Sequence, residues 1–370
     1  MKDSSSPKAF GLFDLADVTW TKGVVVNKSA VKKRTMKAIV VALSALTLTA
    51  CGTGDGGGDG KGGGDGGSKA KAAKNLSATS LSTDFATDIS TDFSTKVIYG
   101  DDNRLDLYDV KDARRLQLAD STVALIAAAN VNVTGDKAHI AAMPFANAFG
   151  SPLCPTERFR DQSSAAFCSG FLIAPDIIVT AGHCIASDQG PKNDCSQTKI
   201  VFGFALNHAG DSLDAVPTSE VYSCVKVLKR EQLSQGQDYS VIQLDRAVSN
   251  HQPLKLRASG APEMTDELMV IGHPSGLPTK VADGAAVRLI RPDYIRASLD
   301  TYGGNSGSAV FNVRTNEVEG ILVRGEQDFI YQGSCLVSKK CGQNDCRGED
   351  VTRVSYVVPY AHEAQAATAH

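Results

Sequence analysis

Three polar side chains stand in contexts that suit hydrolysis by a nucleophile. His183 ends an apolar run and is followed by Cys184, Asp238 opens a strand-like run, and Ser306 lies in the glycine-rich stretch Gly303–Ser308. A serine hydroxyl is a poor nucleophile at neutral pH unless an imidazole accepts its proton, and a carboxylate must orient that imidazole. The sequence therefore supplies the three groups of a serine-nucleophile triad, in the order His, Asp, Ser.

The surroundings of Ser306 narrow the class of hydrolase. Glycines beside a nucleophile let the substrate approach the main chain and let backbone N–H groups point at a developing oxyanion. The order His, Asp, Ser differs from the Ser, Asp, His order of α/β-hydrolases, and Ser308 stands where their G-x-S-x-G motif ends in glycine. These two differences disfavour an esterase of that fold.

The elements that must position these groups are predicted to be short strands. From Val97 onward, β-branched runs recur between Gly and Pro turns, which is typical of sandwiches and barrels rather than βα units. Helix-forming sequence is limited to Lys111–Leu118 and an alanine-rich end after Pro359. The predicted strands are Thr122–Ala127, Phe171–Thr180, Lys199–Phe204, Ser219–Leu228, Tyr239–Leu244, Glu267–Ile271, Ala286–Leu289, Ser308–Val313, Glu317–Val323 and Val351–Val358.

Several motifs resemble those of the trypsin/chymotrypsin superfamily of serine endopeptidases. They are TAGHC at Thr180–Cys184, DYSVIQL at Asp238–Leu244, GNSGSAVF at Gly304–Phe311 and GILVRG at Gly320–Gly325. VIYGDDNR at Val97 and GHPSGLPTKVADG at Gly272–Gly284 are closer to the bacterial glutamyl-endopeptidase (V8-like) branch. The resemblance implies an all-β fold of two packed antiparallel six-stranded β-barrels, with the active site in the cleft between them. It also implies polypeptide substrates and no cofactor.

The resemblance assigns a role to each matching residue. His183 would be the general base, Asp238 the residue that orients it, and Ser306 the nucleophile. The amides of Gly304 and Ser306 would form the oxyanion hole. Leu322, Val323 and Gly325 would pair with the substrate backbone as an added strand, a common way to hold an extended peptide.

Two departures from the family pattern bear on activation and specificity. Asn305 replaces the aspartate that pairs with a freed N-terminus in the animal digestive enzymes, so that activation switch is not expected. Leu322 stands where the glutamyl-specific relatives have a histidine, which argues against glutamate specificity.

Asp300 and Thr301 stand where a trypsin-like enzyme keeps the carboxylate that receives Arg or Lys, Asp300 being six residues before Ser306. One hypothesis is therefore a preference for basic P1 residues, by charge pairing with Asp300. The alternative is that the loop turns Asp300 outward. Under the first hypothesis, the bond between Lys96 and Val97 is a site of self-processing.

The first 96 residues are expected to deliver and anchor the enzyme. A basic cluster precedes an apolar run that ends at Cys51, as in a bacterial lipobox, and a glycine-rich tether follows. Residues 1–50 are interpreted as an upstream extension with a lipoprotein signal, the start being Met1 or Met36. Residues 51–96 are interpreted as the lipidated cysteine, tether and linker or propeptide. Barrels are predicted over 97–255, with the histidine and aspartate, and over 256–370, with the serine.

The chain has nine cysteines, so lipidation of Cys51 leaves eight for disulfides in an oxidising compartment. The family's histidine-loop disulfide implies Cys168–Cys184, and Cys195–Cys224 is expected across a hairpin. Cys154, Cys335, Cys341 and Cys346 allow three pairings that stay open. Zinc is the competing use of the last three, but their spacing lacks a C-x-x-C pair and a histidine, so no metal is expected.

Charge restricts the partners. With 38 basic and 41 acidic side chains the net charge is −3, which argues against a nucleic-acid binder. We expect a monomer that contacts polypeptide substrates and, through Cys51, a membrane. Gly52 favours the outer membrane or cell surface, and cleavage in the linker would release the enzyme. The other class considered is a non-catalytic surface-binding lipoprotein on the same scaffold.

Overall fold

The computed structural model describes residues 97–185 and 194–362. The chain divides into two units, Met1–Ser82 and Thr83–His370, and all described residues belong to the second. The predicted signal, the lipidation site Cys51 and the linker lie outside the described residues. No helix within the described ranges is both long and apolar enough to cross a membrane.

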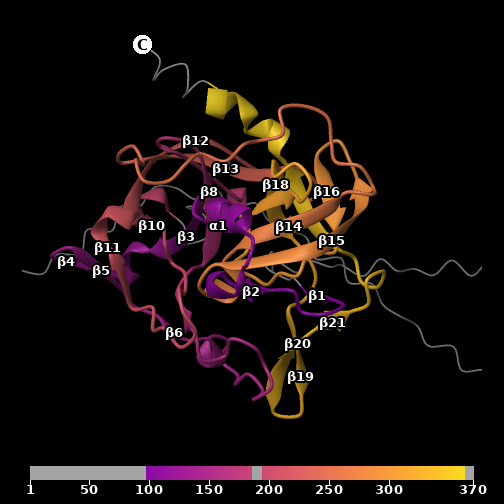
Figure 1. Ribbon diagram of the computed structural model, residues 1–370, viewed down its shortest axis with the longest axis horizontal. Coiled ribbons are helices and arrows are strands. Elements are labelled where there is room, and N and C mark those ends of the chain that lie inside the picture. The colour runs from indigo at the N-terminus through magenta and orange to yellow at the C-terminus, as the bar shows by residue number, and fades with distance from the viewer. Residues whose placement is uncertain (1–96, 186–193, 363–370) are drawn as a thin grey trace, which may run out of the picture. The chain divides into compact units, whose positions relative to one another are not determined.

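Six antiparallel strands close into a first barrel, in the order β10-β12-β13-β9-β8-β3 (Figure 1). Every residue of β8 and β9 is buried. Burial on both faces explains why their sequences are nearly continuous apolar runs rather than alternating ones. The strands are β3 (Thr122–Ala127), β8 (Cys168–Ala174), β9 (Ile177–Thr180), β10 (Thr198–Val201), β12 (Val221–Gln232) and β13 (Asp238–Leu244).

A second sheet has the order β14-β17-β18-β22-β16-β15-β2, and an additional β14–β15 pairing closes six of its strands into a second barrel. All of its pairings are antiparallel. The predicted pair of six-stranded barrels is therefore confirmed. The strands are β14 (Glu267–Gly272), β15 (Lys280–Ile290), β16 (Tyr294–Ala297), β17 (Ala309–Asn312), β18 (Val318–Arg324) and β22 (Glu349–Arg353).

The first two strands of the described chain pair with strands from the C-terminal half of the sequence. Strand β1 (Ile98–Tyr99) runs parallel to β21 (Lys340–Cys341), and β2 (Leu105–Asp106) lies antiparallel to β15. The strands of the first barrel begin only at Thr122. The division between residues 255 and 256 stays a prediction, but the segment at 98–106 crosses it.

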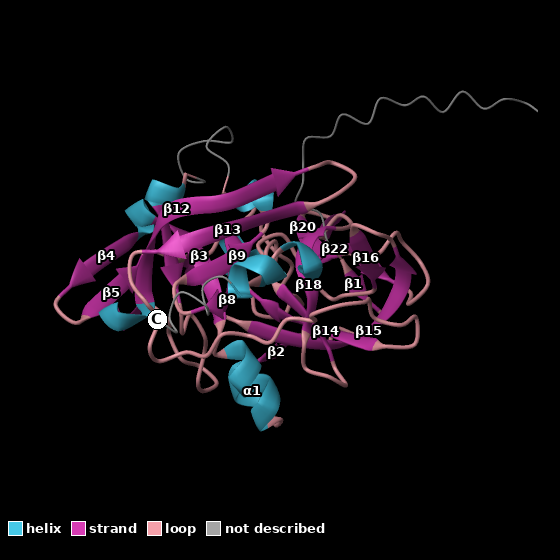
Figure 2. Ribbon diagram, turned by 90° about the horizontal axis from the view of Figure 1, so that it is seen from above, coloured by secondary structure: helices cyan, strands magenta, loops and turns pink. Residues whose placement is uncertain are grey.

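Smaller elements surround the barrels, and strands are the commonest regular element of the described chain (Figure 2). Helix α1 (Ala113–Ala119) lies within the predicted helical stretch apart from its last residue. It begins after Asp112, whose side chain accepts the N–H of Arg114 at 2.8 Å, as an N-cap does. The remaining strands are β4 (Val131–Thr134), β5 (Lys137–Ile140), β6 (Met143–Pro144), β7 (Ser163–Ser164), β11 (Ala215–Pro217), β19 (Phe329–Gln332) and β20 (Cys335–Ser338).

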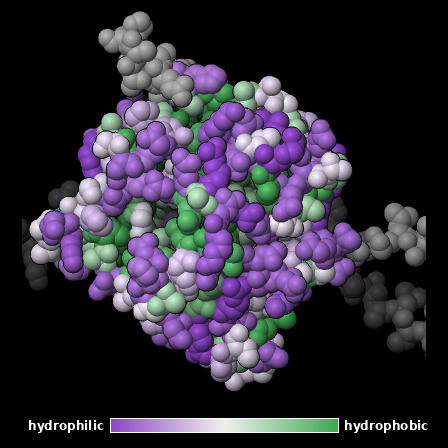
Figure 3. All heavy atoms as spheres, in the orientation of Figure 1, coloured by the Kyte–Doolittle hydropathy of each residue, from purple (hydrophilic) through white to green (hydrophobic). Residues whose placement is uncertain are grey.

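The two barrels pack through a shared hydrophobic core. Val123 and Leu125 of β3 belong to the same buried cluster as Met269 and Ile271 of β14. A separate cluster fills the second barrel and includes Leu268 and other side chains that alternate with the first set. The face seen in Figure 3 is mostly hydrophilic, with hydrophobic atoms in small areas between polar ones.

All eight described cysteines form disulfides. The structure pairs Cys168 with Cys184 and Cys195 with Cys224, as expected from the sequence. The pairings that the sequence left open are Cys154–Cys335 and Cys341–Cys346. Oxidised sulfurs are not the thiolates that zinc requires, so the disulfides replace the zinc alternative.

The disulfides should contribute unequally to stability, because the entropic effect of a cross-link grows with the loop that it closes. Cys154–Cys335 spans a sequence separation of 181 and Cys341–Cys346 one of 5. Replacing both cysteines of the first pair by serine should lower the free energy of unfolding by about 5 kcal/mol, against about 2 kcal/mol for the second pair. Urea denaturation of the two double variants measures this difference. Equal losses would show that loop closure does not set the contributions.

Candidate active site

The turn that carries His183 packs tightly against β12 and β13. Strand β9 leads into a short 3-10 turn, Gly182–Cys184. A Cβ added at Gly182 would lie 2.0 Å from the Glu231 carbonyl oxygen, so the turn can approach β12 only with glycine there. The backbone N–H of His183 donates to Asp238 Oδ1 at 3.1 Å, and its Nδ1 lies 2.8 Å from Asp238 Oδ2.

Asp238 is ionised and fixes the orientation of the imidazole. It is the first residue of β13, it is 1% exposed, and its own N–H donates to the Thr352 hydroxyl at 3.1 Å. Burial raises the pKa of Asp238, but the hydrogen bonds and charge of His183 and the charge of Arg324 outweigh burial and leave that pKa below its ordinary value. A carboxylate beside Nδ1 selects the tautomer with the proton on Nδ1, which leaves Nε2 as the basic nitrogen.

Arg324 of β18 supports the aspartate from the second barrel. Its Nη2 donates to the carbonyl oxygens of Leu233 and Gly236 at 3.0 Å and 2.7 Å, in the loop that leads to Asp238. The guanidinium therefore fixes that loop and also places positive charge near the carboxylate. The sequence analysis did not identify Arg324. The only sign of its role in the sequence was a charged residue within the run of a buried strand.

Ser306 lies in the turn between β16 and β17, and this turn is attached to the first barrel. Ser306 is 2% exposed, and its carbonyl oxygen accepts the N–H of Ser169 on β8 at 2.8 Å. The same oxygen lies 3.6 Å from the sulfur of Cys184, the residue after His183. Although 123 residues separate them in the sequence, Ser306 and His183 therefore meet at the same disulfide.

The group formed by Cys168, His183 and Cys184 brings potential metal ligands within 4.8 Å of one another. Both sulfurs belong to one disulfide, however, and a disulfide sulfur is not a thiolate ligand. Within residues 97–185 and 194–362 this is the only such group. The group therefore shows only that the His183 imidazole lies close to the Cys168–Cys184 disulfide, which joins β8 to the turn that carries His183.

The glycines that flank Ser306 are required by backbone geometry. Gly304 and Gly307 both have φ of +90°, a conformation that other residues rarely adopt. A Cβ at Gly304 would lie 2.6 Å from the His273 carbonyl oxygen. No backbone carbonyl among the described residues accepts the N–H of Gly304. The oxyanion-hole roles of Gly304 and Ser306 stay predictions.

Ser169 connects the two sides of the site, and sequence reasoning missed it. Besides the backbone bond to Ser306, its hydroxyl donates to the Gly304 carbonyl oxygen at 2.8 Å and accepts the His273 N–H at 2.9 Å. His273 itself is fully buried, and burial lowers its pKa to about 4, so it stays neutral. The signal for Ser169 in the sequence was a lone hydroxyl between a cysteine and a glycine in an apolar run.

Asp300 faces the N-terminal segment. It is 4% exposed, and its two carboxylate oxygens accept the backbone N–H groups of Tyr99 at 2.7 Å and Asn103 at 2.9 Å. Burial raises the pKa of Asp300 to about 6, against the two N–H donors, which lower it. Thr301 is buried beside it and donates through its hydroxyl to Glu349 at 3.2 Å. Sequence reasoning foresaw neither contact, and the basic P1 preference stays a prediction.

The predicted substrate strand is only partly open to a peptide. The backbone N–H and carbonyl of Leu322 already bond to Ser308 and Gly307, at 3.0 Å and 2.7 Å. Strand β18 lies between β17 and β22. Its pairing with β17 ends at Ile321, so among the described residues no strand pairs with Val323 on that side. The pairing of Leu322, Val323 and Gly325 with substrate stays a prediction, and both backbone groups of Leu322 are already bonded within the protein.

Gly307→Ala should destabilise the protein strongly, because its Cβ would lie 2.0 Å from the Ser169 carbonyl oxygen in addition to the strained φ. We expect a loss of about 2–5 kcal/mol in the free energy of unfolding, from about 1–2 for the left-handed backbone and about 1–3 for overpacking. Gly260→Ala is the matched control, since Gly260 has φ of +76° and nothing within 4 Å of the added Cβ. Chemical denaturation that gave equal losses would contradict the packing argument.

A family model and a solved structure are similar to parts of this chain. Residues 168–321 match the family model of the trypsin-like peptidase domain, and this segment contains His183, Asp238 and Ser306. No curated protein matches the chain. A solved structure titled "Structure of Glu endopeptidase in complex with MPD" is 16% identical, with a TM-score of 0.42, and the match covers 73% of this chain and 100% of that one.

Proposed function

Because residues 168–321 form a trypsin-like serine peptidase domain, we propose that Ser306, His183 and Asp238 carry out its hydrolysis of peptide bonds. The observation that carries the proposal is the 2.8 Å contact between His183 Nδ1 and Asp238 Oδ2, beside the disulfide that also contacts Ser306. A carboxylate that fixes the imidazole next to a serine is the arrangement that makes the hydroxyl nucleophilic.

The proposed reaction proceeds through an acyl-enzyme. Ser306 Oγ attacks the substrate carbonyl carbon while His183 Nε2 takes the hydroxyl proton, and Asp238 stabilises the imidazolium that forms. The oxyanion of the tetrahedral intermediate accepts hydrogen bonds from the N–H groups of Gly304 and Ser306. The C–N bond then breaks as His183 returns the proton to the amine, and water hydrolyses the ester by the same steps.

The substrate proposed is an extended polypeptide that lies along Val323 and Gly325. A Cβ at Gly325 would lie 1.6 Å from Glu349 Oε2, so glycine lets the strand approach that carboxylate. Main-chain pairing of this kind gives affinity without sequence preference, and side-chain pockets then set specificity. Membership of the V8-like branch is part of this proposal.

We further propose that the enzyme is exported as a monomer and anchored to the bacterial cell envelope through Cys51. The eight described cysteines form four disulfides, which persist in oxidising compartments and are rare in the cytosol. Cleavage within residues 51–96 would release the enzyme from its anchor.

Labelling with a fluorophosphonate probe tests the triad. The wild-type protein should react at one serine, Ser306→Ala should abolish labelling, and His183→Ala should slow it by at least about a hundredfold, because the general base is lost. Ser219→Ala, at an exposed serine, should leave labelling unchanged and is the control. A folded wild-type protein that did not react would favour the non-catalytic surface-binding lipoprotein.

Fractionation of bacterial cells tests the anchor. The wild-type chain should partition with membranes and incorporate labelled palmitate, and Cys51→Ser should abolish both, because the thiol is the acceptor of the lipid. Cys346→Ser is the control for loss of a cysteine without loss of the anchor, because its disulfide closes the short loop that is expected to contribute less. Membrane partitioning of Cys51→Ser equal to that of the wild type would contradict this part of the proposal.

A further inference from the structure

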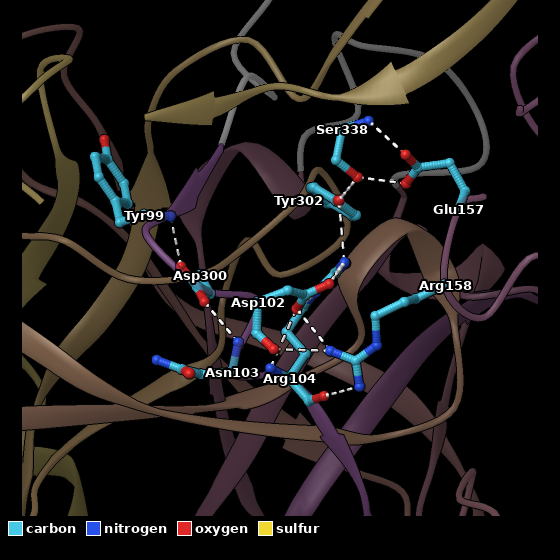
Figure 4. Close-up of polar contacts among 9 residues, drawn as sticks. All are labelled: Tyr99, Asp102, Asn103, Arg104, Glu157, Arg158, Asp300, Tyr302 and Ser338. Atoms are coloured by element: carbon cyan, nitrogen blue, oxygen red, sulfur yellow. Dashed lines mark hydrogen bonds and ion pairs between the residues drawn. The ribbon is translucent and has the colours of Figure 1, made fainter. Parts of the chain in front are cut away.

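The N-terminal segment 99–104 is bound to the loop that leads into the serine turn (Figure 4). Both carboxylate oxygens of Asp300 accept backbone N–H groups of this segment, from Tyr99 and Asn103. The next loop residue, Thr301, donates its N–H to the Val97 carbonyl oxygen at 3.4 Å. These bonds join residues about 200 positions apart in the sequence, at a buried place where water cannot replace them.

A buried guanidinium makes the next contact along the loop. Arg104 is 1% exposed, and its Nη2 donates to the Tyr302 hydroxyl at 3.0 Å while its carbon atom Cζ lies 4.0 Å from the centre of the Tyr302 ring. Asp102 holds the guanidinium by two bonds, at 2.8 Å to Nε and 2.7 Å to Nη2. Arg158 donates to the carbonyl oxygens of Asp102 and Arg104, at 2.8 Å each.

The contacts continue from Tyr302 on its other side. The Tyr302 hydroxyl bonds to the Ser338 hydroxyl, and the Ser338 N–H donates to Glu157 Oε1 at 2.9 Å. Tyr302 is completely buried, and its hydroxyl contacts Arg104 and Ser338. The ring therefore stands in a fixed place between the N-terminal segment and β20.

This fixed residue begins the serine turn. The Tyr302 carbonyl oxygen accepts the N–H of Asn305 at 3.0 Å, and the N–H of Gly303 donates to Asp328 Oδ2 at 2.8 Å. Ser306 follows directly, so a displacement of Tyr302 moves the backbone that carries both the nucleophile and the Gly304 amide.

From these contacts we propose that Asp300 and Arg104 are positioning residues, through which docking of segment 99–104 sets the conformation of the serine turn for every substrate. The proposal rests on the function proposed above, because it concerns the reactivity of Ser306. It gives Asp300 a role different from the selection of basic P1 residues, since its two oxygens are directed at backbone N–H groups.

The segment is separable from the barrels, which makes the proposal testable. Strands β1 and β2 contain two residues each and lie outside both closed sets of six strands. Weaker docking therefore leaves the barrel ladders intact and changes the loop that the segment holds.

The test uses Asp300→Asn, Arg104→Lys and Tyr302→Phe in the full-length protein. Asparagine removes one acceptor, lysine cannot reach Asp102 and Tyr302 with one planar fork, and phenylalanine removes only the hydroxyl. We measure the rate constant of fluorophosphonate labelling, and kcat and KM on peptides with Lys, Glu or Leu at P1. We expect Asp300→Asn and Arg104→Lys to lower labelling and kcat by about 10–100-fold for all three peptides, with KM within about twofold. Tyr302→Phe should show a smaller loss in the same direction.

Glu319→Gln is the matched control for a merely structural effect. Glu319 is a buried carboxylate of β18 that pairs with Arg257 and does not contact the serine turn. It should lower the thermal midpoint as Asp300→Asn does, yet leave labelling and kcat of the folded protein unchanged. An equal loss of labelling in this control would overturn the proposal.

Two further outcomes would also overturn it. If Asp300→Asn left labelling unchanged and lost activity only on the peptide with Lys at P1, Asp300 would be a specificity residue. If all three variants kept wild-type labelling and kcat, the docked segment would not position the turn. Should Asp300→Asn fail to fold, Tyr302→Phe decides by itself, because it leaves the ring in place. Failure of the wild type to react would instead contradict the proposed triad.

Discussion

The hydrogen bond from the Ser169 N–H to the Ser306 carbonyl oxygen joins the two barrels at the point where their functional groups must meet. His183 and Asp238 are carried by the first barrel and Ser306 by the second, so the proposed reaction depends on how the barrels are held together. The bond is buried and lies beside the Cys168–Cys184 disulfide. A buried bond in that position cannot be exchanged for a bond to water. This is why a single contact between β8 and the serine turn can hold the two in place.

Buried ion pairs also lie within the N-terminal part of the described chain and link it to its surroundings. Arg104 is paired with Asp102, and Lys280 with Asp106. Burial lowers the pKa of Lys280 to about 8, against the attraction of Asp106, which raises it. Such pairs are costly to bury and contribute little net stability, but breaking one leaves an uncompensated charge. Under the positioning proposal, the contribution of Arg104 is conformational, because its pairing with Asp102 holds the guanidinium against Tyr302.

The local sequence predicted those strands whose ends are marked by their own residues, an apolar run between turn residues. Strand β3 occupies the predicted range Thr122–Ala127, because its apolar run is bounded by turn residues. Strand β15 extends six residues before the predicted start at Ala286, and β16 was not predicted at all. Each also pairs with a strand distant in sequence, β15 with β2 and β16 with β22, and the energy of those pairings is absent from any local window.

The sequence by itself determined the chemical groups, their order and the two-barrel architecture, since a serine, an imidazole and a carboxylate in family motifs have few other uses. Only the tertiary structure decided how Cys154, Cys335, Cys341 and Cys346 pair, that Ser169 and Arg324 support the site, and that Asp300 binds the backbone of the N-terminal segment. The physical reason is separation along the chain. Contacts such as that of Asp300 with Tyr99, or Ser169 with Ser306, arise when barrel closure brings together segments whose local sequences carry no record of one another.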